Sequence, residues 1–498
     1  MTHVVANADM LATAANAVAR IGSTIDAAGA AALGPTTAAL APAIDEVSAA
    51  IAALFQTHGL EGQAIIRHAA AFHREFNQAL AAAGNAYAQA EAANAAAVSN
   101  ALGALSAPLQ SLLERPSTGT IAPGSGNGLQ AMLAQAATGE LTALIMGGTG
   151  NPLPIPEYVT AINNNYIQPL LPGANGQGLF TPQEFWPNNP EVGDMTFNQS
   201  NREGLRLLQA AINTELAFGN KVNVLGYSSS ATIVHEAILD FMAMGTGAPD
   251  PGDLSFLMLG SPHNPVGGLF ARFPGFYIPL LDVPFNGATP ADNPYPTAIY
   301  SMQYDGAAHA PQYPLNPFAT LNALFGFQFL HWQHPWHSPE VLASAQLLPT
   351  SPGYTGNTDY YMLTTQNLPL LEPIRQIPYI GQPLAEMIQP SMRVLVDLGY
   401  ADYGPTGNYA DIPTPAGIIQ IVDPFALGYY LTLGAVQGPT GALVDLGFLP
   451  ESFRPDIYPY VPSLSPGLNV SFGQSSVTGI SLLTGAVGPL LELIPPPH

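Results

Sequence analysis

The chain has 498 residues, of which 47% are hydrophobic and 9% are charged, whereas an average protein has roughly 25% charged residues. It has 11 Lys and Arg against 34 Asp and Glu, which gives a net charge of −23, and Lys221 is the only lysine. So few cations cannot neutralise a phosphate backbone or bind an anionic lipid surface by charge, which excludes nucleic acid as a partner. The chain has no cysteine, which excludes disulfides, thiolate metal sites and cysteine nucleophiles.

The sequence shows no classical export signal and no clean membrane span. It starts MTHVVANADM, without the basic and apolar regions of a secretory signal peptide. The nearest approach to a span, VTGISLLTGAVGPLLELI at 477–494, contains glycines, Pro489 and Glu492. We therefore expect no spanning helix, although a surface that touches a membrane remains allowed. The length favours two or more domains.

Residues 1–100 have the composition of helices, because they are rich in alanine and contain only two prolines. Apolar residues follow the three-to-four spacing of one helix face, at Val47, Ile51, Leu54, Ile65, Phe72, Phe76 and Leu80. The pattern predicts an antiparallel helical hairpin. Two helices cannot bury both apolar stripes by themselves, so we expect a helical partner. Residues 101–140, with ERPSTGTIAPGSGNG, are predicted to be a linker.

From residue 141 onward, short apolar runs alternate with helical patterns and are separated by Gly and Pro. Strands are predicted at 141–146, 222–225, 254–260 and 297–304. An amphipathic helix is predicted at 201–216, with Leu205, Leu208 and Ile212 in register. This alternation predicts an α/β domain with a central, mostly parallel sheet over residues 141–365.

The stretch VNVLGYSSSATIVHEAI, residues 222–238, runs from a strand through three serines into a helix. A strand, a G-x-S-x-small motif and a helix together form the nucleophile elbow, in which a strained turn exposes the middle serine above the sheet. Ser228 is the candidate nucleophile, and Gly226 and Ser230 are small because neighbouring backbone passes close to both. The alternative is that the serines only cap the helix that starts at Ala231.

A serine nucleophile also needs an oxyanion hole and an acid. The backbone N–H of Ser229 and a second N–H from Gly148 or Thr149, in the GGTG loop after the first strand, would stabilise an oxyanion. The α/β hydrolases carry their triad in the order Ser, acid, His. Asp305 follows the strand at 297–304, at the edge of the sheet where open α/β proteins keep their sites.

Several histidines could serve as the base. The run GFQFLHWQHPWH contains His331, His334 and His337, and His309 lies upstream. Histidines at this spacing could also bind a metal, but no carboxylate or cysteine lies within the run, so we favour aromatic packing of at least one of them. We expect no metal and no cofactor.

The N-terminal region resembles the PE family of mycobacterial proteins, through GSTIDAAGAAALGPTTAALAPAIDEVSAAIAALFQTHG, AAAFHREFNQAL and AYAQAEAANA. Residues 141–365 resemble the PE-PPE domain, a cutinase-like serine α/β hydrolase. The matching stretches there are GGTGNPLP, GYSSSA, PVGGLFARFPGFYIPLLDVPFNGATPADNPYPTAIYSMQYDG, PQYPLNPFATLNALFGFQFLH and GNTDYYMLTTQNLPLLEPIR. These stretches lie in regions that make up roughly three quarters of the chain.

The resemblance implies roles for particular residues. Ser228 matches the family nucleophile, Asp305 the acid and His331 the base, with His334 and His337 as alternative bases. Relatives usually read Tyr-Asp-Gly-x-x-Asp-Phe-Pro where this chain reads YDGAAHAP, so His309 stands at the second Asp position. If that second acid orients the base, this protein is weakened or inactive, whereas nothing is lost if Asp305 does so.

The resemblance also implies a destination and partners. Tyr87 and Glu91 match the Y-x-x-x-D/E signal of type VII secretion, which implies a protein of the mycobacterial cell wall or cell surface. The partners implied are the secretion machinery, a secretion chaperone and a PPE protein that covers the helical stripes. The extension 366–498, rich in Pro and Gly, is expected either to pack on the hydrolase domain or to contact the envelope.

Three functions fit these observations. The first is a secreted esterase or lipase that hydrolyses short- to medium-chain acyl esters through an acyl-enzyme. The second is an acyltransferase that passes the acyl group to an envelope glycolipid. The third is a catalytically silent surface protein. Aromatic segments FPGFYIPLL and FLHWQHPW are the natural walls or lid of an acyl pocket, or else part of the core.

Overall fold

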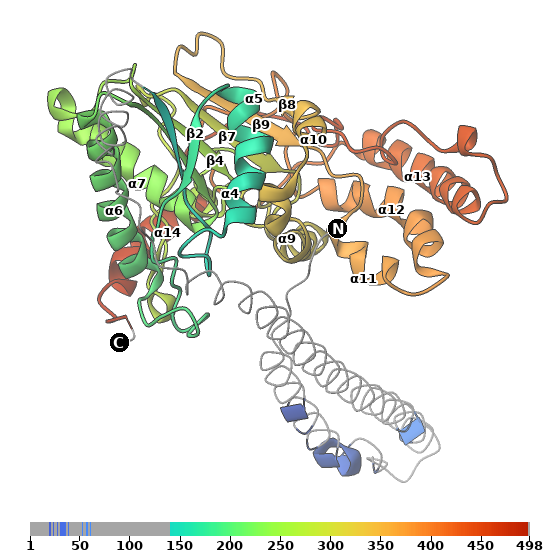
Figure 1. Ribbon diagram of the computed structural model, residues 1–498. Coiled ribbons are helices and arrows are strands. Elements are labelled where there is room, and N and C mark those ends of the chain that lie inside the picture. Colours follow the sequence, from blue (N-terminus) through green and yellow to red (C-terminus); the bar gives the residue numbers. More distant parts are fainter. Residues whose placement is uncertain are drawn as a thin grey trace, which may run out of the picture. The chain divides into compact units, whose positions relative to one another are not determined.

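The computed structural model describes residues 19–20, 23, 27, 30–35, 38, 52, 56–57, 60 and 140–496 (Figure 1). The chain divides into two compact units, Met1–Pro123 and Gly124–His498. Most of the predicted hairpin and linker, including Tyr87 and Glu91, lies outside the described residues, so the hairpin stays a prediction.

The second unit is built on a seven-stranded sheet in the order β2-β1-β3-β4-β7-β9-β8. All neighbouring pairs are parallel except β8 and β9. The prediction of a mostly parallel sheet is therefore confirmed. The strands are β1 Leu141–Ile145, β2 Asn175–Gly178, β3 Lys221–Tyr227, β4 Leu254–Leu259, β7 Thr297–Met302, β8 Gln346–Leu347 and β9 Thr358–Leu363.

The central strands are apolar on both sides because helices cover both faces of the sheet (Figure 1). Helices α6, Phe197–Ala217, and α7, Ser229–Met244, pack on the face to which Leu144 and Val224 point. Helix α4, Pro156–Ile162, packs on the opposite face, with Ile145 and Leu225. Alternate residues of each strand thus fill two separate cores, and the carboxyl ends of the strands lie at one edge.

Shorter elements surround that edge and provide the walls of the site. A two-stranded antiparallel hairpin pairs β5, Tyr277–Ile278, with β6, Val283–Pro284. A 3-10 helix, His331–Trp336, follows α9, Pro317–Phe329, after one residue. Other α-helices of this unit are α5 Gln168–Leu170, α8 Leu269–Arg272, α10 Pro339–Ala343 and α11 Glu372–Arg375.

The segment beyond residue 365 packs on the rest of the second unit. Its helices are α12 Gly381–Asp397, α13 Pro424–Asp445 and α14 Gly479–Leu491. Leu371, Ala385 and Val396 share one buried cluster with Met302 and Leu363 at the ends of β7 and β9. Of the two expectations for this segment, packing on the domain is thus observed. Among the described residues, no helix has the length and apolar character needed to cross a membrane.

Candidate active site

Ser228 lies at a sharp turn between β3 and α7. Its backbone has φ 57° and ψ −117°, a left-handed conformation that is strained for a residue with a side chain. A Cβ added at Gly226 would lie 2.6 Å from the carbonyl oxygen of Ser230, so position 226 has no room for a side chain. The side chain of Ser230 has a further use, since its Oγ accepts the backbone N–H of Tyr227 at 2.8 Å. The strand-turn-helix geometry expected from the sequence is present.

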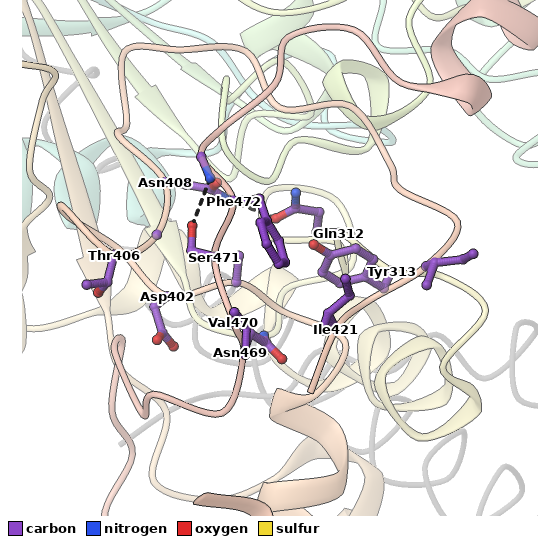
Figure 2. A pocket seen from close by; sticks show the side chains of 14 residues that line it. Gln312, Tyr313, Asp402, Thr406, Asn408, Ile421, Asn469, Val470, Ser471 and Phe472 are labelled. Carbon is purple, nitrogen blue, oxygen red and sulfur yellow. Dashed lines mark hydrogen bonds between the residues drawn. The ribbon is translucent and has the colours of Figure 1, made fainter. Parts of the chain in front are cut away.

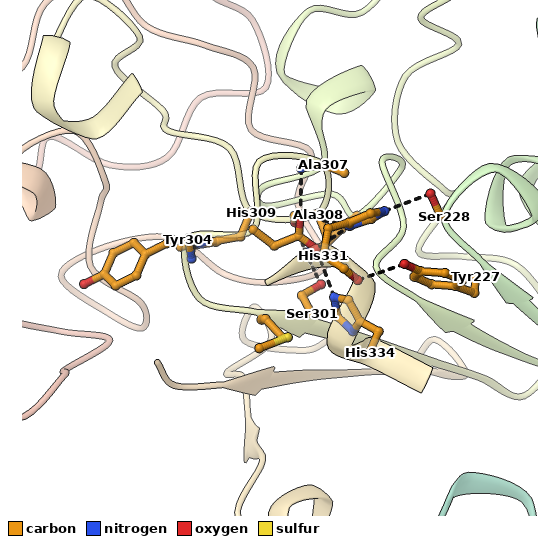
Figure 3. A network of polar contacts seen from close by, with 12 residues as sticks. Tyr227, Ser228, Ser301, Tyr304, Ala307, Ala308, His309, His331 and His334 are labelled. Carbon is orange, nitrogen blue, oxygen red and sulfur yellow. Dashed lines mark hydrogen bonds and ion pairs between the residues drawn. The ribbon is translucent and has the colours of Figure 1, made fainter. Parts of the chain in front are cut away.

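The side chain of Ser228 does not cap the helix that follows it. Ser228 occupies the N-cap position of α7, but its side chain makes no capping hydrogen bond. Its Oγ instead lies 2.8 Å from Nε2 of His331 (Figure 3). Nδ1 of the same ring lies 2.8 Å from Oδ2 and 3.0 Å from Oδ1 of Asp305. Of the four histidines that could serve as the base, His331 is the one in contact with Ser228.

The hydrogen-bond chemistry fixes the tautomer of His331. An ionised carboxylate only accepts hydrogen bonds, so Nδ1 carries the hydrogen that is donated to Asp305. Nε2 is then the acceptor and faces the Ser228 hydroxyl. The hydroxyl of Tyr227 donates to the carbonyl of His331 at 2.9 Å, and the two rings stack at 5.4 Å. These contacts orient the imidazole toward Ser228.

Asp305 receives a second imidazole. Nε2 of His334 lies 2.9 Å from Asp305 Oδ2, and both residues are fully buried. Burial lowers the pKa of His334, so its ring is neutral and donates one N–H to the carboxylate. Burial alone would raise the pKa of Asp305, but the electrostatic attraction and hydrogen bond of His331, together with the hydrogen bond of His334, outweigh it and lower that pKa below its usual value. Asp305 is therefore ionised throughout the neutral range.

The same three residues bear on the question of a metal. The histidine run contains no carboxylate, but the fold brings Asp305 to it from the loop after β7, and the ligand atoms of Asp305, His331 and His334 lie within 4.8 Å of one another. Two N–H donors on one carboxylate account for these distances without an ion. The spacing of the histidines does not reveal this cluster, because its carboxylate comes from outside the run.

The other two histidines lie away from the serine. His337 has its Nε2 3.1 Å from the sulfur of Met302. His309 accepts the backbone N–H of Tyr304 at 3.0 Å, and its ring stacks on Tyr400 at 4.8 Å. Burial lowers the pKa of His309 to about 3, so it is neutral. The acid in contact with His331 is Asp305, and His309 at the atypical position takes no part in that contact.

The residues expected to form the oxyanion hole surround Ser228. Ser229 is the first residue of α7, so its N–H points out of the helix N-terminus, where anions are favoured. A Cβ added at Gly148 would lie 3.4 Å from Cβ of Ser228, and Thr149 lines the same cavity as Ser228 and Ser229. Gln183 joins these segments, because its side chain accepts the Ser229 hydroxyl at 2.5 Å and its carbonyl accepts the Gly150 N–H at 2.8 Å. No sequence signal pointed to Gln183.

A cavity of about 210 Å³ opens beside Ser228. Apart from the residues of the turn and Thr149, its walls are apolar: Phe185, Phe197, Pro262, Leu269, Phe270, Ile278, Leu281, Val283, Phe285, Ala307 and Phe327. The segment FPGFYIPLL contributes Ile278 and Leu281, so it is a wall, as one of the two expectations had it. The segment FLHWQHPW contributes none of these wall residues, and its Trp332 is exposed.

A second hollow, of about 150 Å³, is lined by polar as well as apolar residues, including Gln312, Asp402, Asn408 and Phe472 (Figure 2). It contains none of the residues around Ser228. Part of its polar lining is already paired, since the Asn408 amide donates to Gln312 at 2.8 Å. This hollow is therefore separate from the candidate site at Ser228.

Two family models match the chain: PE family at residues 4–94 and PE-PPE domain at residues 172–401. PE family protein PE3 of Mycobacterium tuberculosis (strain ATCC 25618 / H37Rv) is 49% identical and covers 100% of both chains. Esterase PE16 of the same strain is 41% identical over 90% of this chain and 78% of its own length. A cutinase-like protein from Cryptococcus sp. is 18% identical, over 34% of this chain and 79% of its own, with a TM-score of 0.25. The chain belongs to the PE family and carries a PE-PPE domain.

Proposed function

We propose that this protein is a serine esterase that hydrolyses short- to medium-chain acyl esters, with Ser228 as nucleophile, His331 as base and Asp305 as acid. The observation that carries the proposal is the continuous row of hydrogen bonds from Ser228 Oγ through both nitrogens of His331 to Asp305, at 2.8 Å each. The name of the relative Esterase PE16 supports the same reaction class.

The mechanism follows from the row. Ser228 Oγ attacks the ester carbonyl carbon while its proton passes to Nε2 of His331, and Asp305 stabilises the imidazolium that forms. The N–H groups of Ser229 and of Gly148 or Thr149 stabilise the oxyanion. His331 then gives the proton to the alcohol oxygen as the C–O bond breaks. Water attacks the acyl-enzyme by the same route, which releases the carboxylic acid and restores the Ser228 hydroxyl.

The cavity beside Ser228 fits the acyl chain. Its walls hold no charged side chain among the described residues, so it favours alkyl over ionised groups. Ser228 and Ser229 lie at its polar end, where the ester carbonyl would sit.

The test uses p-nitrophenyl esters from acetate to palmitate with the purified protein, a Ser228→Ala variant and a Ser344→Ala control. Ser344 is exposed and ends a short helix away from the row. We expect kcat to fall at least about 10³-fold in Ser228→Ala and to stay unchanged in Ser344→Ala. Two results together would contradict the proposal. The intact protein would be inert on all esters, even with a glycolipid acceptor added, and a fluorophosphonate probe would fail to label it.

Membership of the PE family supports a PPE protein as the general kind of partner. Export by type VII secretion through Tyr87 and Glu91, a secretion chaperone and a cell-surface location stay predictions. Immunoblotting culture filtrate and cell-wall fractions for the protein and for a Tyr87→Ala variant tests them.

A further inference from the structure

A separate apolar cavity of about 350 Å³ lies among α8, α9 and the loop after β7. Its lining includes Phe273, Pro311, Pro314, Ala323 and Leu324. Among the described residues, the only polar side chain that lines it is Thr320, whose hydroxyl already donates to the Pro314 carbonyl at 2.7 Å. No polar side chain of the described lining is therefore left to recognise a polar ligand, and the cavity suits an alkyl chain.

This cavity shares a wall with the cavity beside Ser228. Leu269 and Phe327 line both of them, and the neighbours Gly306 and Ala307 line one each. Phe327 is 55% exposed and its ring stacks on the imidazole of His331, at 5.0 Å between centroids and 19° between planes. The wall between the two cavities thus packs on the proposed base, His331.

The position of His331 decides which part of an ester passes that wall. His331 must protonate the alcohol oxygen, so that oxygen lies beside Nε2 when the C–O bond breaks. Tyr227 and Phe327 both stack on this imidazole, and Phe327 is the one that also lines the larger cavity, so an alkyl chain on the alcohol that extends past Phe327 reaches that cavity. The acyl chain remains on Ser228, in the cavity that Ser228 and Ser229 line.

We propose that the larger cavity binds an alkyl chain carried by the alcohol part of the ester, so the natural substrate has apolar groups on both sides of the ester bond. This inference rests on the proposed function and gives its substrate class: lipid-like esters of apolar alcohols. Each methylene group that moves from water into this cavity should raise kcat/KM about fourfold. The gain ends when the cavity is full.

The experiment separates the two sides of the ester. Ethyl, butyl and hexyl butyrate are hydrolysed below their solubility limits by the intact protein, by Leu324→Glu and by Leu321→Glu. Both leucines are exposed on α9, but only Leu324 lines the cavity. We expect kcat/KM to rise with alcohol length in the intact protein and in Leu321→Glu. In Leu324→Glu the rise should be lost, so that kcat/KM for hexyl butyrate no longer exceeds that for ethyl butyrate.

Equal effects of the two glutamates would overturn the proposal and indicate that the exposed helix face contacts substrate aggregates. A rate that depends on acyl length but not on alcohol length would overturn it as well. Binding to the Ser228→Ala variant, followed by ligand-observed NMR, makes the result independent of catalysis. The proposal is supported, even if no ester is hydrolysed, when hexyl butyrate binds more tightly than ethyl butyrate and when adding Leu324→Glu weakens the binding of hexyl butyrate. Equal binding of the two esters would overturn the proposal.

Discussion

At the scale of single residues, the unusual feature of the site is a carboxylate with two imidazole donors. His331 and His334 approach the same oxygen of Asp305, at 2.8 and 2.9 Å. A hydrogen bond to a charged group is worth about 1.5–3 kcal/mol when buried. His334 touches neither Ser228 nor the cavity beside it, so we expect it to act through Asp305 as a positioning residue.

Removal of the His334 side chain should therefore slow the chemical step more than it weakens substrate binding. We expect His334→Leu to lower kcat about tenfold, with KM within twofold, because Asp305 loses one of two donors that fix it. His334→Gln keeps an N–H donor and should retain more activity. His337→Leu is the control, because His337 contacts the sulfur of Met302 and not Asp305. Steady-state kinetics on p-nitrophenyl butyrate decide the matter, and a pure rise in KM would contradict the positioning role.

His309 predicts an effect of pH on stability. Burial lowers its pKa in the folded state to about 3, whereas an unfolded histidine titrates near about 6.5. Below that pH the unfolded chain takes up a proton that the folded chain does not, so stability is lost as pH falls toward 3. We expect the fall in Tm from about pH 6.5 to about pH 4 to be smaller in His309→Phe than in the intact protein. Each Tm is expressed relative to that protein's own Tm at pH 8. If Tm then falls equally with pH in both proteins, His309 is not the cause of the loss of stability.

At the scale of elements, strands with continuous apolar runs could be predicted and those without could not. The runs at 141–146, 222–225, 254–260 and 297–304 correspond to β1, β3, β4 and β7. Strand β2 reads NGQG and is an exposed edge strand with no apolar signal. Helices α12 and α13 each contain an internal proline, Pro390 and Pro439, which ordinarily predicts a helix break.

The same division applies to the site. Ser228 stood out because its motif, the strand before it and the helix after it are all local. His331 and Asp305 needed the chain order and the family resemblance, because four histidines were possible bases. The contact of His334 with Asp305 depends on the 3-10 turn after α9, and that of Gln183 on a loop with φ 51°. Neither leaves a trace in residue spacing.

The β5–β6 hairpin forms one wall of the cavity beside Ser228, and one carboxylate at its turn joins it to the start of α6. Asp282 accepts the Thr196 hydroxyl at 2.5 Å, the Tyr277 hydroxyl at 2.8 Å and the Asn198 amide at 3.2 Å. Thr196 also caps α6, so Asp282 ties the hairpin to the start of that helix. Its own backbone is left-handed, with φ 49°.

Asp282→Asn should therefore loosen the wall and leave the chemistry intact. Asparagine tolerates the left-handed backbone but has only one acceptor oxygen for three donors. We expect KM for p-nitrophenyl butyrate to rise severalfold and kcat to change less than twofold. Glu203→Gln, on the exposed face of α6, makes the same chemical change away from the cavity and should alter neither value. If kcat falls and KM stays, the hairpin has another role.

At the scale of the whole second unit, the C-terminal segment supports the loop that carries the proposed acid. The hydroxyl of Tyr304, the residue before Asp305, donates to Asp397 of α12 at 2.7 Å. The side chain of Gln303 donates to the carbonyl of Ser463 at 3.1 Å. Near the β5–β6 hairpin, Thr484 of α14 donates to the carbonyl of Pro274 at 2.8 Å. Distant parts of the segment thus contact two sides of the site.

Truncation after residue 365 should consequently abolish folding of the second unit and not merely its activity. It would expose Met302, Tyr304 and Leu363, which are buried partly against Leu371 and Val396, and each large apolar side chain exposed costs about 1.5–3 kcal/mol. The free energy lost on exposing a few such side chains equals the free energy of unfolding of a typical domain, about 5–15 kcal/mol. Truncation after residue 478 removes α14 and the contact with Pro274 but leaves that cluster complete, so we expect a soluble protein with a lower Tm. Circular dichroism and thermal melts of both truncated proteins test this, and a cooperative melt from the shorter one would mean that residues 141–365 form their core without the C-terminal segment.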